Sequence, residues 1–86
     1  MTPSLLEFPL DFPVKVLGRT EPGLAQEILA LVLQHAPDFE SSQMQMRPSR
    51  EGKYLSLTCT IRATSQAQLD ALYQALTRHP RVVMVL

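Results

Sequence analysis

The alternation of residues 53–63 constrains the fold of this chain more than any other feature. Apolar side chains occupy every second position of this run, and tyrosine, serine, threonine and arginine lie between them. Because successive side chains of a strand point to opposite faces of a sheet, the pattern predicts a strand with one buried and one open face. The residues expected on the buried face are Leu55, Leu57, Cys59, Ile61 and Ala63.

A turn precedes this strand and separates it from another. Residues 48–52 read Pro-Ser-Arg-Glu-Gly, a composition typical of turns. Residues 41–47 alternate before the turn and predict a second strand of a hairpin, in which Met44 and Met46 are expected to pack into the core. Two more strands are predicted, at residues 12–17 and 81–86.

Two amphipathic helices are predicted between these strands. Aliphatic residues recur at helical spacing from Leu24 onward, and again from Leu69 onward. Thr20 is the expected N-cap of the first helix, and Ser65 with Gln68 three residues later predicts a capping box at the start of the second. A proline follows each helix and ends it.

The resulting order of elements, β-α-β-β-α-β, determines the expected fold. It predicts a four-stranded antiparallel sheet with strand order 4-1-3-2 and both helices on one face. This architecture is the ferredoxin-like α+β sandwich. We expect a single domain over residues 1–86, in which residues 1–11 form an extended arm that lies against the domain.

Charge and cysteine content exclude several classes of protein. Eight basic and eight acidic residues cancel, so the whole chain has no built-in attraction for nucleic acid or an anionic membrane. The single cysteine, Cys59, excludes a disulfide or a cysteine-ligated cluster within one chain. Neither a membrane-spanning stretch nor a secretory signal is visible. We therefore expect a cytoplasmic protein with no cofactor, no nucleic-acid partner and no membrane partner.

Six stretches of the chain carry a family resemblance: Leu-Leu-Glu-Phe-Pro at residues 5–9, Val-Lys-Val-Leu-Gly at 14–18, Pro-Ser at 48–49, Gly-Lys-Tyr at 52–54, Ile-Arg-Ala-Thr at 61–64 and Val-Met-Val-Leu at 83–86. They resemble the YbeD-like family of small bacterial proteins. Together with the helices between them, they cover nearly the whole chain. The resemblance implies a ferredoxin-like fold similar to that of regulatory domains that bind amino acids in metabolic enzymes. It implies no established activity, so no catalytic residues are carried over.

A narrower resemblance concerns the loop Gly-Arg-Thr-Glu-Pro-Gly-Leu at residues 18–24. It is similar to the start of an amino-acid-binding regulatory domain of the ACT type, where this loop receives the ligand. From the residues themselves, N–H groups at a helix start together with Arg19 could hold a carboxylate or a phosphate. The alternative is a capped turn with a solvated arginine. The candidate ligand-binding residues are Gly18, Arg19, Thr20, Gly23 and Leu24.

The last strand is an edge of the predicted sheet and carries no charge after Arg81. An unprotected apolar edge favours pairing with another chain, which predicts a homo-oligomer or a protein partner. The alternative is that the N-terminal arm covers this edge with Leu5, Leu6 and Phe8. The exposed, charged hairpin is a second candidate contact. The candidate partner-binding residues are Arg50, Lys53, Tyr54, Val83 and Val85.

Other kinds of function find less support in the residues. An acylphosphatase-like hydrolase on this fold would need an asparagine, and the chain has none. His35 and His79 end helices that should run antiparallel, so they are expected at opposite ends of the sandwich and not in one metal site. RNA-binding sheets of similar topology stack bases on two or three aromatic residues, and the open face offers Tyr54 alone. We expect a non-enzymatic regulatory or adaptor protein, with a small-molecule sensor as the alternative.

Overall fold

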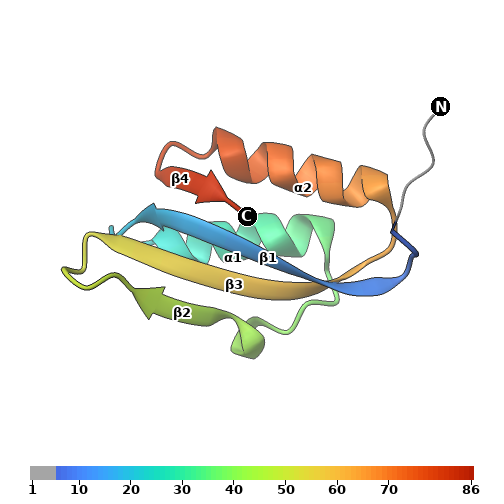
Figure 1. Ribbon diagram of the computed structural model, residues 1–86, viewed down its shortest axis with the longest axis horizontal. Helices are drawn as coiled ribbons and strands as arrows, with labels where there is room; N and C mark the ends of the chain where they lie inside the picture. The colour runs from blue at the N-terminus through green and yellow to red at the C-terminus, as the bar shows by residue number, and fades with distance from the viewer. Residues whose placement is uncertain (1–5) are drawn as a thin grey trace.

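The chain follows the predicted order of strands and helices. The computed structural model describes residues 6–86 (Figure 1). The elements of this part are β1 (Leu10–Arg19), α1 (Leu24–His35), the short 3-10 helix η1 (Ser41–Gln43), β2 (Gln45–Pro48), β3 (Tyr54–Ala63), α2 (Gln66–Arg78) and β4 (Val82–Val85). β1 begins two residues earlier and ends two residues later than predicted, because its pairing with β3 continues at both ends.

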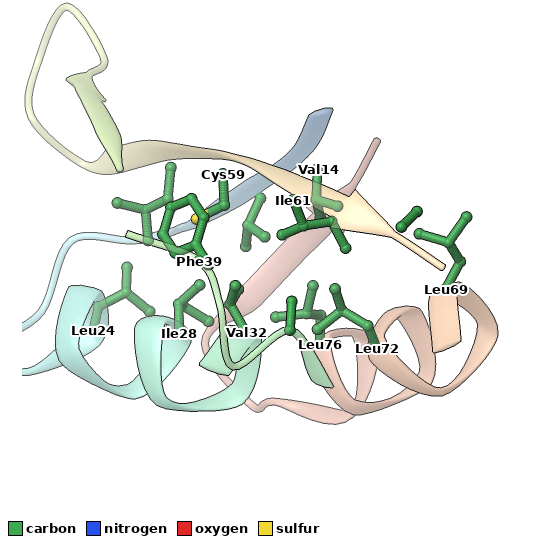
Figure 2. Packing of buried hydrophobic residues seen from close by; sticks show 14 residues of the cluster. Val14, Leu24, Ile28, Val32, Phe39, Cys59, Ile61, Leu69, Leu72 and Leu76 are labelled. Atoms are coloured by element: carbon green, nitrogen blue, oxygen red, sulfur yellow. The ribbon is translucent and has the colours of Figure 1, made fainter. Parts of the chain in front are cut away.

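The strands of residues 6–86 form one antiparallel sheet in the order β2-β3-β1-β4. This is the predicted order 4-1-3-2 read from the opposite edge. Figure 2 shows α1 and α2 on the same side of the sheet, which leaves the other face open. The predicted ferredoxin-like α+β fold is therefore confirmed.

The strands differ in length, and this leaves part of β1 without a neighbour on one side. β1 and β3 pair along all ten residues of each. β4 accompanies only the second half of β1 (Figure 1), as far as Lys15 and Leu86, which exchange two backbone hydrogen bonds of 3.2 and 2.8 Å. By the alternation of the backbone, the nitrogen of Pro13 faces the side of β1 that β4 does not reach. Proline lacks a backbone N–H, and it is tolerated there because no strand of residues 6–86 lies on that side to accept a hydrogen bond from it.

One cluster of buried apolar side chains holds the sheet against the helices. In Figure 2 the side chains of α1 and α2 point toward those of β1 and β3. Burying one of the larger aliphatic side chains contributes about 1.5–3 kcal/mol. The inward-facing positions predicted for β3 are confirmed, although Leu55 is only partly buried. The most buried members are Val14, Val16, Leu24, Ile28, Val32, Ala36, Leu57, Cys59, Ile61, Ala63, Leu69, Leu72 and Leu76.

Helix α1 begins three residues later than an N-cap at Thr20 would require, so that prediction is wrong. The N-cap is Gly23, with φ 87° and ψ −7°. Pro22 and Gly23 form the centre of a turn in which the Leu24 N–H donates to the carbonyl of Glu21 at 3.2 Å. These angles match the third position of a type II turn, which favours proline before glycine. The Pro-Gly turn therefore takes up the residues that were expected to form the first helical turn.

Helix α2 begins at the predicted cap. The Ser65 hydroxyl accepts from the Gln68 N–H at 3.0 Å. The Gln68 side chain accepts in turn from the Thr64 N–H at 2.7 Å and donates to the carbonyl of His35 at 2.7 Å. Gln68 therefore connects the start of α2 to the end of α1, where the last carbonyls of a helix lack partners within it.

The segment before the hairpin differs from its prediction. Residues 41–43 form η1, and β2 begins only at Gln45. Met44 packs against the core, but Met46 is 57% exposed, so its predicted burial is wrong. Met46 lies on the edge strand, beyond the cover of the helices. Phe39, in the loop after α1, is buried instead and belongs to the same core cluster as Cys59 (Figure 2).

The thiol of Cys59 behaves as part of the core. Its side chain is buried between the sheet and the helices, and burial raises its pKa from 9.0 to about 11. The thiol therefore stays protonated at neutral pH. A protonated, enclosed thiol acts as a small hydrophobic group and is a poor nucleophile.

Candidate functional site

The loop after β1 and the β2–β3 hairpin lie side by side at one end of the sheet. Arg19 and Tyr54 are register partners at the end of the β1–β3 ladder. The Thr20 N–H donates to the carbonyl of Lys53 at 2.9 Å, which ties the loop to the hairpin. Within the hairpin, the Tyr54 N–H donates to the Ser49 hydroxyl at 3.1 Å. The structure thus places members of the two predicted sites next to each other.

A shallow depression lies between these two loops. Its volume is about 320 Å³, and its lining residues are Arg19, Thr20, Glu21, Lys53 and Tyr54. Glu21 is bound by Arg81, with 2.7 Å between the carboxylate and Nε. Arg19 and Lys53 have no ion-pair partner among residues 6–86. The depression therefore presents two uncompensated positive charges beside two hydroxyl groups, which suits a small anion.

The remaining candidate ligand residues have structural positions. Leu24 is 1% exposed and belongs to the core. Gly18 is buried beneath it, and a Cβ at Gly18 would lie 3.0 Å from the Leu24 side chain. Gly23 supplies the left-handed conformation of the turn. These three residues shape the loop, whereas Arg19 and Thr20 face the depression.

A network of polar side chains behind this loop was not predicted from the sequence. Arg81 donates to Glu27 and to the carbonyl of Pro22, both at 3.2 Å, in addition to its contact with Glu21. His79 accepts the Arg81 N–H at Nδ1, so its other nitrogen carries the proton that it shares with Glu27 at 2.8 Å. The network connects the start of α1 to the start of β4, residues that are more than fifty positions apart in the sequence.

The second candidate surface is the edge formed by β4. Val83, Met84 and Leu86 are 51%, 49% and 63% exposed, respectively. Met84 pairs with Leu17 in β1, and both lie on the open face. Val85 instead pairs with Val16 and packs against the core, so its side chain faces inward. Of the candidate partner-binding residues in β4, Val83 is accessible and Val85 is largely covered.

The N-terminal arm was the predicted alternative cover for this edge. Leu5 lies outside the described residues. Phe8 packs against the core, and Leu6 lines a hollow of about 270 Å³ with Phe12 and Tyr73, beside the start of α2. This hollow lies next to the first half of β1, the stretch that β4 does not reach. No pattern in the residues indicated the hollow, because the length of β4 relative to β1 was not predictable from local sequence.

The two histidines lie apart, as predicted. His35 ends α1 near Gln68, and His79 follows α2 near Glu27. Among residues 6–86, histidine, cysteine and carboxylate side chains form no group of three that could hold a metal ion.

Almost the whole chain matches a known protein family. Residues 3–86 match the family described as a protein of unknown function, DUF493. A UPF0250 protein of Nitrosomonas europaea is 54% identical over 83 residues, which are 96% of this chain and 95% of that protein. A UPF0250 protein of Ralstonia nicotianae is also 54% identical and is covered to 86%. The chain belongs to the DUF493 family. The predicted membership of a YbeD-like family of uncharacterised bacterial proteins is thereby confirmed.

Solved structures agree with the DUF493 fold described above. The solution structure of protein HP0495 from H. pylori has a TM-score of 0.75 over 99% of this chain and 88% of that chain, at 15% identity. The C-terminal domain of the MgtC protein from Mycobacterium tuberculosis has a TM-score of 0.64 over 95% and 89%, at 18% identity. At these identities the likeness concerns the fold alone. No helix within residues 6–86 has the length and apolar character needed to cross a bilayer.

Proposed function

We propose that this DUF493 protein is a non-enzymatic adaptor or regulatory protein of the bacterial cytoplasm that acts by binding protein through β4. The observation that carries the proposal is an exposed sheet edge without charge. Within residues 6–86, β4 has a strand on one side only, and Val83 and Met84 are each about half exposed. Natural edge strands are usually guarded by charge or proline. β4 contains neither, although its pairing with β1 has a register shift between Leu17 and Gly18.

Backbone groups support strand addition at this edge. The inward hydrogen bonds of β4 include those of Leu86 with Lys15, so by alternation the N–H and carbonyl groups of Val85 point away from β1. An added antiparallel strand would bond to these groups. Its side chains would meet those of Met84 and Leu86 on the open face. A second copy of the chain offers the same edge, so we expect self-association by pairing of two β4 strands.

Sedimentation equilibrium tests this pairing over about two decades of protein concentration. The wild-type chain is expected to form dimers. Val83→Lys places a charge on the edge and is expected to raise the dimer dissociation constant at least tenfold, or about 1.4 kcal/mol. Met46→Lys is the matched control, because Met46 is equally exposed but lies on β2, at the other edge. A chain that stays monomeric at every concentration, or dimers that Met46→Lys weakens equally, would contradict the proposal.

A second candidate function is sensing of an amino acid or related carboxylate at the depression. Arg19 and Lys53, the two cations without partners there, favour it, because the Glu21 carboxylate is already occupied by Arg81. A ligand at about a hundred times its Kd would stabilise the fold by about 2.7 kcal/mol. Thermal unfolding with individual amino acids and lipoate is expected to reveal such a ligand, and Arg19→Ala should remove its effect. Arg62→Ala, on the open face far from the loop, is the control, and absence of any shift would reject this candidate.

A further inference from the structure

The charges of this neutral chain are not evenly distributed over its surface. The open face of the sheet carries four cations, Lys15 and Arg19 of β1, Arg47 of β2 and Arg62 of β3, by their register and alternation. Asp11, opposite Arg62, is the carboxylate of β1 on this face. The other carboxylates of residues 6–86 lie on the helices, in the loops and in the hairpin turn. A face with an excess of positive charge therefore lies opposite the helix layer.

Most of this excess positive charge lies in three neighbouring rows of the sheet. Each row consists of residues that are paired across the strands with one residue of β3. The row of Tyr54 contains Arg19, the row of Ser56 contains Arg47 and Leu17, and the row of Thr58 contains Lys15. β4 adds Met84 to the second row and Leu86 to the third. We refer to the six side chains Lys15, Arg19, Arg47, Leu17, Met84 and Leu86 as the open-face patch.

The cations of the open-face patch are available for binding. None of them forms an ion pair with a carboxylate of residues 6–86, and all three side chains are exposed. Glu21, the carboxylate that lines the depression beside Arg19, is already engaged, because it binds Arg81. The patch thus combines uncompensated positive charge with two exposed apolar side chains, Met84 and Leu86, which are 49% and 63% exposed.

We infer that the open-face patch is a docking surface for an acidic protein segment that also carries apolar side chains. This inference rests on the proposed function, because the occupant is a protein. Carboxylates of the segment would lie over Lys15, Arg19 and Arg47, and its apolar side chains would cover Met84 and Leu86. Charge complementarity of this kind accelerates association and selects partners, and its contribution falls as salt screens it beyond about 8 Å at physiological ionic strength.

Protein fits this surface better than nucleic acid does. Single-stranded nucleic acids bind to sheets through stacking of bases on several aromatic rings, as well as through phosphate contacts. Among residues 6–86, Tyr54 is the aromatic side chain of the strands that lies on the open face. The apolar members of the patch are leucine and methionine, which adapt to apolar side chains of a partner but give bases no ring to stack on.

An NMR titration of the ¹⁵N-labelled full chain tests the inference. The probe is a short synthetic peptide of glutamate with interspersed leucine, compared with a peptide in which lysine replaces glutamate and with an oligothymidylate of similar charge. The glutamate peptide is expected to shift the amide signals of Leu17, Thr58 and Met84. Raising the salt concentration should weaken its binding severalfold.

Variants in which one cation of the open-face patch is replaced by glutamate test the role of its charge. Lys15→Glu and Arg47→Glu are each expected to weaken binding of the glutamate peptide about tenfold, since each replaces an attraction by a repulsion. Arg78→Glu is the matched control, because Arg78 is an exposed cation of α2, in the helix layer. An unchanged amide spectrum of each variant would exclude misfolding as the cause of a loss.

Each other outcome overturns the inference. Tighter binding of the oligothymidylate at the same amides would make the patch a nucleic-acid surface. Equal binding of the lysine peptide, equal loss in Arg78→Glu, or no binding of the glutamate peptide would remove the patch as an acidic-segment site. Failure of the proposed function can be distinguished from failure of this inference, because a separate measurement, the dimerisation of the wild-type chain and of Val83→Lys, tests the proposed function. Dimerisation can persist without peptide binding, and peptide binding can occur in a monomer.

Discussion

Replacement of Leu72 by alanine is expected to lower the free energy of unfolding by about 2–5 kcal/mol. Leu72 has no exposed surface, and Figure 2 shows it pointing from α2 toward the sheet. Its truncation removes apolar contacts and leaves a cavity that the surrounding helix and strands can close only in part. Stabilities of native domains are about 5–15 kcal/mol, so the variant would lose a large share of the total.

Urea denaturation followed by circular dichroism measures this loss. Met46→Ala is the matched control, since it also shortens a large apolar side chain, but at a position that is 57% exposed. Its cost is expected to stay within about 0.5 kcal/mol, as for surface positions in general. Equal losses in the two variants would contradict the burial of Leu72 or the exposure of Met46.

Replacement of Gly18 by valine is expected to destabilise the protein by about 1–3 kcal/mol and to loosen β4. A Cβ at this position would lie 3.0 Å from Cδ2 of Leu24 and 3.1 Å from the carbonyl oxygen of Arg81. The Arg81 carbonyl cannot easily move away from an added Cβ, because it accepts a hydrogen bond from the Arg19 N–H at 2.9 Å. The register of β1 with β4 also shifts between Leu17 and Gly18, so the added side chain would act on the attachment of the edge strand.

Hydrogen exchange of the backbone amides, together with urea denaturation, tests this second prediction. The Leu86 amide, which donates to Lys15, should exchange faster in Gly18→Val. Gly52→Asn is the control, because a Cβ at Gly52 would meet nothing within 4 Å, and asparagine tolerates its φ of 76° better than most residues do. If Gly18→Val were as mild as Gly52→Asn, close packing at Gly18 would not limit the size of the side chain.

The fold was predictable because its determinants are local in the sequence. The alternation of residues 53–63, the helical spacing from Leu24 and from Leu69, and the cap at Ser65 each specify one element. Their order then leaves few topologies. The start of α1 was not predicted correctly, because Thr20 satisfies a general capping preference, whereas Pro22 and Gly23 form a specific turn.

Features that depend on distant residues were missed. The exposure of Met46 follows from the width of the helix layer relative to the sheet, which no local pattern records. The contacts of Arg81 with Glu21 and Glu27 depend on how closely the start of β4 approaches α1.

The candidate site was predictable in part for the same reason. Arg19 and Lys53 were each singled out, but as members of two separate sites, and only the register of β1 with β3 brings them together.

Edge protection in this sheet is uneven, and this limits how far an assembly could grow. β2 and β4 are both four residues long, but β2 contains Arg47 and Pro48, and the uncovered half of β1 contains Pro13. Charge and proline are the usual means by which sheets prevent unwanted pairing. β4 has neither. Two copies joined through β4 would bury the one edge of each, within residues 6–86, that has neither charge nor proline, so the assembly would close at two chains instead of continuing into a fibre.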